Sequence, residues 1–330
     1  MSQTPRLKTS AMIASLAPEG QRTKPAPFGH ALAALARTRP EIVGLTADLA
    51  KYTDLHIFAK EHPDRFYQMG MAEQLLMSAA AGLAREGFMP FATTYAVFAA
   101  RRAYDFICMA IAEDRLNVKI ICALPGLTTG YGPSHQATDD LAIFRAMPNL
   151  TIIDPCDACE IEQAVPAIAE HAGPVYMRLL RGNVPLVLDE YGYRFELGRA
   201  ALLRDGAEVL IISSGFMTMR ALETAERLAG DRIGAAVLHV PTIKPLDTAT
   251  ILREAARPSR LVVIAENHSV IGGLGEAVAH LLLTAGQHSR FRHIGLPDAF
   301  LDAGALPTLH DRYGISTHRM VRQIKGWLSG

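Results

Sequence analysis

The sequence lacks the features that mark several classes of protein. Its 330 residues carry 33 Lys and Arg against 33 Asp and Glu, so its formal net charge is zero. A neutral chain without a basic cluster argues against nucleic acid or an anionic membrane as its main partner. No apolar run reaches the roughly 18 residues that a membrane span needs, and residues 1–19 lack the apolar core of a signal peptide. We therefore expect a cytoplasmic protein.

Metal and dinucleotide motifs are also incomplete. The four cysteines are too few and too scattered for a disulfide framework. Cys156 and Cys159 have the spacing of half a zinc site, but no second pair of ligands follows, so we predict no metal ligands in the chain. The glycines of Gly272–Gly275 lack the full G-x-G-x-x-G spacing, and we interpret them as a tight strand-to-helix turn rather than a dinucleotide loop.

The chain does contain short apolar runs that alternate with longer helical patterns, which is typical of α/β architecture with mostly parallel sheets. In the first half we expect strands at Ile42–Leu45, Val118–Ala123, Thr151–Ile153 and Val175–Arg178, and helices at Ala72–Arg85, Phe98–Ala112, Asp139–Ala146 and Ala158–Glu170. In the second half we expect strands at Val209–Ser213, Ala235–Val240, Leu261–Glu266 and Phe291–Ile294, and helices at Met217–Ala229, Thr248–Ala256, Gly275–Leu283 and Thr317–Leu328.

Two domains follow from this length and from a break in the alternation. A Pro- and Tyr-containing stretch begins near Arg181 and has the composition of a linker. We predict a lead-in over residues 1–22, a first domain over 23–186, a linker over 187–198 and a second domain over 199–330. Each domain is expected to be an open, mostly parallel, doubly wound sheet, with the last helix packed on the second sheet.

One carboxylate stands out at the start of an Ala-rich helical pattern. Glu73 lies in G-M-A-E-Q, residues 70–74, before a run of small residues. A carboxylate held in an apolar pocket has a raised pKa and can share a proton with a bound ring nitrogen. The alternative is an exposed carboxylate in the first helical turn, stabilised by the helix dipole.

Three further groups follow predicted strands or lie on loops, where α/β sheets bind ligands. Asp48 comes directly after the first strand, and His135 lies in a loop rich in Gly and Pro. Tyr95 and Phe98 are three residues apart and would share a helix face, where they could sandwich a flat heterocycle. The alternatives are ordinary core aromatics and a histidine that caps a helix.

These segments together resemble the transketolase family. The resemblance rests on many motifs in one order: G-L-T-A-D-L (44–49), D-R-F-Y-Q-M-G-M-A-E-Q (64–74), F-A-T-T-Y-A-V-F (91–98), R-A-Y-D (102–105), P-G-L-T-T-G-Y-G-P-S-H-Q (125–136), M-P-N-L-T-I-I-D-P (147–155), R-L-L-R-G-N-V-P (178–185), I-K-P-L-D (243–247) and E-N-H-S-V-I-G-G-L-G (266–275). The chain resembles only the C-terminal half of a full-length transketolase, namely its pyrimidine-binding and terminal domains. The family's G-D-G…N metal motif is absent, so the resemblance implies the smaller subunit of a split transketolase.

The resemblance implies a thiamine diphosphate site between this chain and a partner. The partner, an N-terminal-half subunit, would supply the diphosphate and Mg²⁺ site, in an expected α2β2 complex. Glu73 would protonate the aminopyrimidine ring and so help to generate the reactive nucleophile. Tyr95 and Phe98 match positions that wall in the pyrimidine, and Asp48 matches a pocket aspartate.

The substrate residues implied by the resemblance depart partly from the family pattern. His135 matches a histidine that hydrogen-bonds substrate hydroxyls, and Arg181 matches an arginine that grips a distal phosphate. Tyr131 stands where the family commonly has an E-D pair. We therefore expect a ketol transferase for sugars or sugar phosphates whose donor or acceptor is unusual: branched, deoxygenated, sulfonated or unphosphorylated.

Three other functions remain open at this point. The beta subunit of a 2-oxo-acid dehydrogenase has the same two-domain plan and the same glutamate. A deoxyxylulose-phosphate-synthase-like carboligase shares the R-A-Y-D and R-G-N patterns. The third alternative, a catalytically silent assembly subunit, has no physical need for a carboxylate in an apolar pocket.

Overall fold

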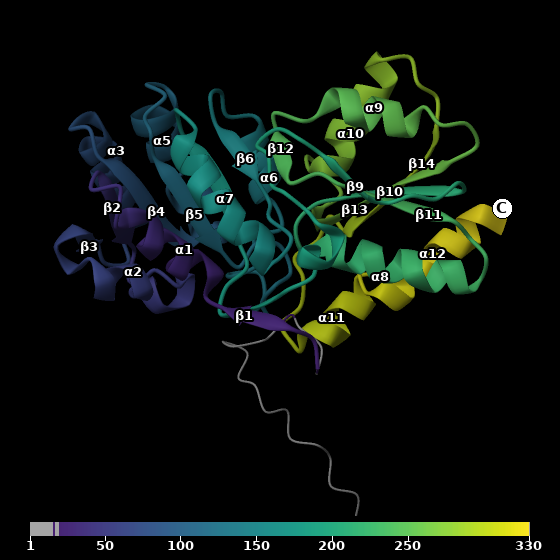
Figure 1. The fold of residues 1–330 in the computed structure, drawn as a ribbon, viewed down its shortest axis with the longest axis horizontal. Coiled ribbons are helices and arrows are strands. Elements are labelled where there is room, and N and C mark those ends of the chain that lie inside the picture. The colour runs from purple at the N-terminus through teal and green to yellow at the C-terminus, as the bar shows by residue number, and fades with distance from the viewer. Residues whose placement is uncertain (1–15, 17–19, 330) are drawn as a thin grey trace, which may run out of the picture.

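The computed structural model describes residue 16 and residues 20–329, which form two large sheets with their helices, one beside the other, and a small two-stranded sheet (Figure 1). Most of the predicted lead-in lies outside the described residues. The first sheet has seven strands, in the spatial order β12 (Thr242–Lys244), β6 (Thr151–Ile153), β7 (Val175–Leu179), β5 (Lys119–Ala123), β4 (Met89–Tyr95), β2 (Ile42–Thr46) and β3 (Phe66–Gln68). The second has five, in the order β14 (Arg290–Leu296), β13 (Leu261–Ser269), β10 (Val209–Ser213), β11 (Ala235–His239) and β9 (Ala201–Arg204).

Both sheets are mainly parallel, which confirms the predicted α/β class. Strands β2, β4, β5 and β7 are buried at every residue, as expected for parallel strands covered on both faces. Because parallel crossovers are right-handed, connections that run in opposite directions along a sheet cover opposite faces. One face of the first sheet carries α1 (Pro27–Ala36), α2 (His56–Glu61) and α7 (Ala158–Glu170); the other carries α3 (Glu73–Arg85), α4 (Ala96–Arg102), α5 (Tyr104–Ile107) and α6 (Asp140–Arg145).

One helix prediction for the first half was wrong in detail. The single helix expected at 98–112 is divided into α4, α5 and a π-helical turn η4 (Cys108–Ala112), because Ala103 leaves the helical conformation at φ −106°. Strand β4 was not predicted. Its sequence M-P-F-A-T-T-Y contains Pro and two Thr and does not form an apolar run, yet both threonines are fully buried.

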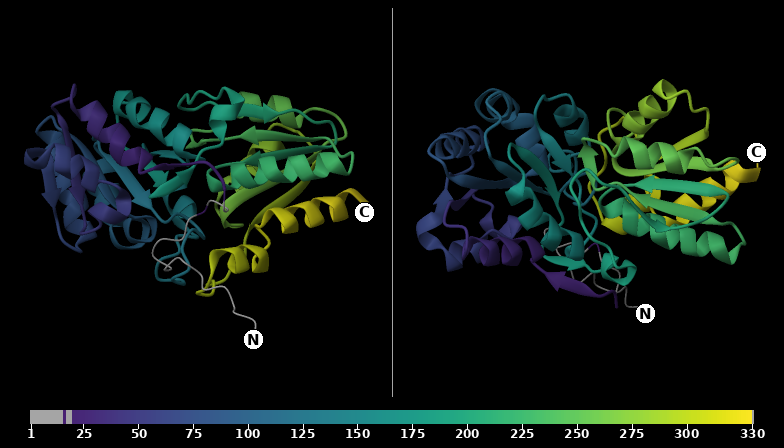
Figure 2. Two further views of the ribbon diagram at one scale, coloured as in Figure 1. Left: turned by 60° about the horizontal axis from the view of Figure 1, so that its bottom comes forward. Right: turned by 45° about the horizontal axis from the view of Figure 1, so that its top comes forward.

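Helices cover both faces of the second sheet. In Figures 1 and 2, α9 (Thr248–Ala255) and α10 (Leu274–Thr284) lie on one face, and α8 (Phe216–Gly230) and α12 (Thr317–Ser329) on the other. We expected the terminal helix α12 to pack on the second sheet, but it packs chiefly on α8. Helix α11 (Leu306–Arg312) precedes it. None of the helices in residues 20–329 is both long and apolar enough to cross a membrane.

The two halves are joined by pairing between segments far apart in sequence. Strand β12 follows the first strands of the second sheet in sequence, but it pairs antiparallel with β6 and so extends the first sheet. Strand β1 (Thr23–Pro25) pairs antiparallel with β8 (Asn183–Pro185), and both of these strands lie within residues 23–186. Short helical turns η2 (Ala50–Thr53), η3 (Pro63–Arg65) and η5 (Leu188–Tyr191) complete the connections. The first sheet therefore depends on residues from both halves of the chain.

Candidate active site

A pocket of about 510 Å³ opens at the carboxyl edge of the first sheet. The ends of β2, β4 and β5 meet there, as they must when parallel strands point the same way. The start of α3 forms a further wall. The lining residues are Ala47, Leu49, Tyr52, Met71, Glu73, Tyr95, Phe98, Arg102, Tyr131 and His135.

Glu73 is the buried carboxylate of this pocket. It is the first residue of α3 and its exposed fraction is 2%. Both carboxylate oxygens accept from Nη1 of Arg102, at 3.3 and 3.4 Å. The structure therefore places Glu73 inside the pocket rather than on a solvent-facing helix start, and pairs it with a guanidinium that is itself half exposed.

Tyr95 and Phe98 form an aromatic corner next to Glu73. Tyr95 ends β4 and precedes α4, so its side chain and that of Phe98 meet on the first turn of the helix. Their ring centroids are 5.6 Å apart and the planes are tilted by 39°. A ring sandwiched between them would need about 7 Å, two van der Waals contacts. A flat ligand can lie against this corner but not between the two rings.

The loop at residues 124–139, between β5 and α6, brings His135 and Tyr131 to the same pocket. The His135 ring lies 5.5 Å from Phe98 and 5.2 Å from Tyr131, measured between centroids. Burial, reinforced by the charge of Arg102, lowers the pKa of His135. At neutral pH its imidazole is therefore uncharged and can both donate and accept a hydrogen bond.

The hydroxyl of Tyr131 is buried and makes no hydrogen bond to any described residue. Burial also raises the pKa of this phenol, so it is a neutral donor at neutral pH. A buried hydroxyl without a partner is costly, and a ligand in the pocket would satisfy it.

Asp48 and Arg181 do not line the pocket. Asp48 is exposed, and its backbone amide and carboxylate both bind the side chain of Gln68. Arg181 follows β7, and its guanidinium lies 5.7 Å from the ring centre of Tyr52. Both residues stand beside the pocket rather than in its wall.

Sequence reasoning missed Arg102 and Tyr52. Arg102 belongs to the R-A-Y-D motif, and its guanidinium lies 4.0 Å from the ring centre of Phe98, four residues earlier on the same helix. That i,i+4 spacing was the available signal. No comparable pattern pointed to Tyr52, which reaches the pocket from η2.

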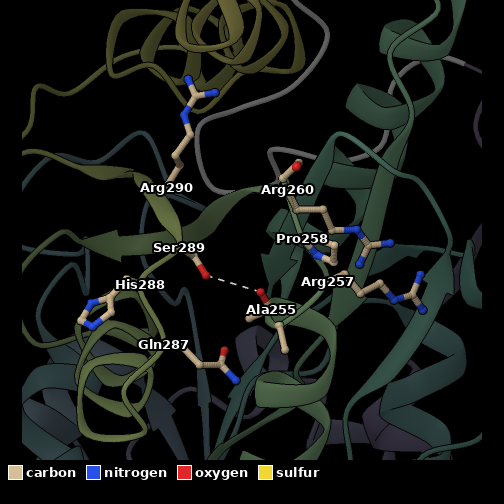
Figure 3. Close-up of a pocket in the computed structure, with 10 residues that line it drawn as sticks. Ala255, Arg257, Pro258, Arg260, Gln287, His288, Ser289 and Arg290 are labelled. Carbon is tan, nitrogen blue, oxygen red and sulfur yellow. Dashed lines mark hydrogen bonds between the residues drawn. The ribbon is translucent and has the colours of Figure 1, made fainter.

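A second hollow of about 390 Å³ lies between the end of α9 and the turn before β14 (Figure 3). It is rich in arginine, but in Figure 3 the side chain of Arg290 points away from those of Arg257 and Arg260. The latter two are paired with Asp205 and Glu254. The hollow therefore has no convergent set of cations. Within residues 20–329, no cluster of three His, Cys, Asp or Glu side chains could hold a metal ion.

Comparison with known families matches almost the whole chain. The sequence profile of the transketolase pyrimidine binding domain matches residues 24–187, and that of the transketolase C-terminal domain matches residues 198–320. A split gene transketolase, solved as an inactive beta4 tetramer, is 41% identical with a TM-score of 0.83, over 92% of this chain and 97% of that one.

Curated relatives agree with these matches. An uncharacterized transketolase family protein of Sinorhizobium fredii is 75% identical over 99% of this chain and 95% of its own length. A 6-deoxy-6-sulfo-D-fructose transketolase subunit of a Clostridium species is 39% identical over 87% of this chain and 88% of its own. The 1-deoxy-D-xylulose-5-phosphate synthase of Syntrophotalea carbinolica is 34% identical over 91% of this chain, which spans only 47% of that enzyme.

Proposed function

The chain belongs to the transketolase family, and from that premise we propose that it is the catalytic-glutamate subunit of a split, thiamine-diphosphate-dependent transketolase. The reaction would move a two-carbon ketol unit from a ketose to an aldehyde. The observation that carries the proposal is the position of Glu73: a carboxylate 2% exposed, at the start of α3, opening onto an aromatic-walled pocket.

The pocket suits one half of the cofactor. An aminopyrimidine is a flat heterocycle with ring nitrogens, and it can lie against Tyr95 and Phe98 with a nitrogen toward Glu73. The described residues offer no metal cluster for a Mg²⁺ diphosphate. We propose that the diphosphate and Mg²⁺ are held by an N-terminal-half partner subunit.

The residues of this chain would divide the work as follows. Bound thiamine diphosphate supplies the carbon nucleophile that accepts the ketol unit. Glu73 holds or releases a proton at the cofactor's ring nitrogen, and the aromatic corner keeps water from that carboxylate. Neutral His135 and the hydroxyl of Tyr131 would hydrogen-bond substrate oxygens. Arg181, whose guanidinium lies 5.7 Å from the ring centre of the pocket residue Tyr52, would bind the far anionic end of a substrate.

The surface next to the pocket supports a partner at this edge. Met71 lines the pocket yet is 81% exposed, and Leu75, Phe106 and Met109 continue the apolar face over α3, α5 and η4. Large exposed apolar faces mark sites of association. We propose that the partner subunit covers this face. The inactive beta4 tetramer of the similar split transketolase is consistent with activity that needs the other subunit.

The substrate proposal is a ketose with an unusual substituent. It rests on Tyr131 in place of an acidic pair. Among the expected substituents, the relative named for 6-deoxy-6-sulfo-D-fructose favours a test of a sulfonated donor first. The matched deoxyxylulose-phosphate synthases support the carboligase alternative, which would use pyruvate.

The test is reconstitution with a stoichiometric partner, captured from the native host on the tagged chain. We expect a partner with a G-D-G…N motif, and ketol transfer from ketoses only when both subunits and thiamine diphosphate with Mg²⁺ are present. Activity with pyruvate instead would favour the carboligase or the dehydrogenase. A chain that forms only homo-oligomers without activity would favour the silent subunit.

A further inference from the structure

The terminal half of the chain, residues 199–329, makes hydrogen bonds to the 124–139 loop near the start of that loop. The side-chain amide of Asn267 makes two hydrogen bonds to the loop backbone there. Its Oδ1 accepts from the Leu127 amide at 2.8 Å, and its Nδ2 donates to the Pro125 carbonyl at 3.3 Å. His310, 2% exposed, donates from Nε2 to the Leu127 carbonyl at 2.8 Å. The backbone N–H and C=O of Leu127 are thus both hydrogen-bonded by side chains more than 130 positions later in the sequence.

A second set of contacts holds the loop near its tip. The Gly304 amide donates to the Gly130 carbonyl at 2.9 Å, and the side-chain amide of Gln136 donates to the Asp302 carbonyl at 3.1 Å. The backbones approach so closely that a Cβ on Gly130 would lie 2.0 Å from the Gly304 oxygen. Only glycine allows that approach.

We propose that the terminal half positions the active-site loop, with Asn267 and His310 as positioning residues that set where Tyr131 and His135 point. The first half holds the same loop from the other side, since Arg101 donates to the Pro133 carbonyl at 3.1 Å and pairs with Asp139. The tip, which carries both substrate-facing side chains, is therefore fixed only when both halves are in contact with it.

The consequence for catalysis rests on the proposed function. A displacement of about 1 Å at a reacting centre can cost about 100-fold in rate. Glu73, Tyr95 and Phe98 lie on α3, β4 and α4, so their positions do not depend on the hydrogen bonds from Asn267 and His310. Loss of these hydrogen bonds should accordingly affect the reaction with the ketose much more than the binding of thiamine diphosphate.

The test compares variants of the full chain in the reconstituted complex. Asn267→Ala removes both hydrogen bonds, and His310→Phe removes the donor while keeping a ring beside Phe216. Ser214→Ala is the control, because it removes a buried hydrogen bond to Asp154 between the two halves without touching the loop. We measure hydrogen exchange of the 124–139 loop, kcat/KM for the ketose, and the Kd of thiamine diphosphate.

We expect at least about tenfold faster exchange in the loop and at least about tenfold lower kcat/KM in both test variants, and neither change in Ser214→Ala. The Kd of thiamine diphosphate should stay within about twofold. Loop exchange as slow as in the control would overturn the proposal, and so would faster exchange with unaltered kcat/KM. If the wild-type complex has no ketol-transfer activity, the proposed function fails on its own, and exchange in the two variants still decides whether the terminal half holds the loop.

Discussion

The carboxylate of Glu73 is buried at the start of α3, so a change of one atom there tests the chemistry with little change in packing. We expect Glu73→Gln to lower kcat by about 10²–10⁴-fold or more, because the amide cannot exchange a proton with a ring nitrogen. Glu86→Gln, at the exposed end of the same helix, is the matched control and should retain full activity. Steady-state kinetics of the complex decide, and equal activities of the two variants would refute the role of Glu73.

Tyr131 allows a second test at the scale of a single atom. Its hydroxyl is buried without a partner among the described residues, so Tyr131→Phe should leave the melting temperature unchanged or higher. If that hydroxyl binds substrate, KM for the ketose should rise about 2- to 10-fold while kcat changes little. Kinetics and thermal unfolding measured on one preparation separate these effects. A lower melting temperature with an unchanged KM would mean that the hydroxyl serves the fold.

At the scale of the element, strand β7 holds a buried positive charge inside the first sheet. Arg178 is 1% exposed and donates to Asp140 at 2.6 and 2.8 Å and to Asp154 at 3.4 Å. Burial opposes its charge, but the two carboxylates outweigh that penalty and raise the pKa of Arg178. It also reaches the backbone oxygen of Asn267, so this strand ties α6 and β6 to the terminal half.

We expect Arg178→Met to lower the free energy of unfolding by about 3–5 kcal/mol, because two buried carboxylates lose their counter-charge. Arg85→Met breaks an ion pair with Asp114 whose partners are both half exposed, and it should cost no more than about 1 kcal/mol. Urea unfolding of each variant gives the comparison. Similar losses in the two variants would show that the buried network does not stabilise the fold.

At the scale of the whole molecule, association is expected through the apolar face beside the pocket. Leu75→Glu places a charge at a side chain that is 52% exposed on α3, and it should abolish capture of the partner subunit because the charge would be buried without a counter-ion. Leu283→Glu changes an equally apolar side chain, 67% exposed, on α10 and should leave capture intact. Sedimentation of the mixed subunits measures both. Normal assembly of Leu75→Glu would place the partner elsewhere.

Stability of the whole molecule should fall in mild acid through His310. Burial, opposed by the hydrogen bond to Leu127 and reinforced by Arg220, lowers the pKa of His310 from 6.5 to about 4. Between these values the unfolded chain binds a proton that the folded chain does not, so the free energy of unfolding decreases as the pH falls, by up to about 3 kcal/mol from this group. His310→Phe lacks this contribution, and its pH profile should be flatter between pH 6.5 and 4. Parallel profiles would contradict the assignment.

Local patterns in the sequence were sufficient for the α/β class and for the gathering of one set of side chains. Strand runs such as 42–45 and 209–212 are apolar throughout, which is typical of parallel strands covered on both faces. Because the carboxyl ends of such strands share one edge, His135, on the loop after the strand expected at 118–123, was expected near that edge, and the family resemblance placed Tyr95 beside the same ligand. The motif around Glu73 added the third member, and the structure brings all three into one pocket.

Contacts between distant segments decided the rest. Asp48 turns outward because its backbone, at φ +59°, is held by Gln68 from the neighbouring strand. Glu73 pairs with Arg102 because α4 packs beside α3. Strand β12 leaves its own half to pair with β6, and Asn267 reaches a loop 140 residues earlier. Amino-acid composition and spacing report what a segment of about ten residues prefers. They carry no information on which distant partner meets it, because that choice depends on how the whole set of elements packs, and so only the tertiary structure decided it.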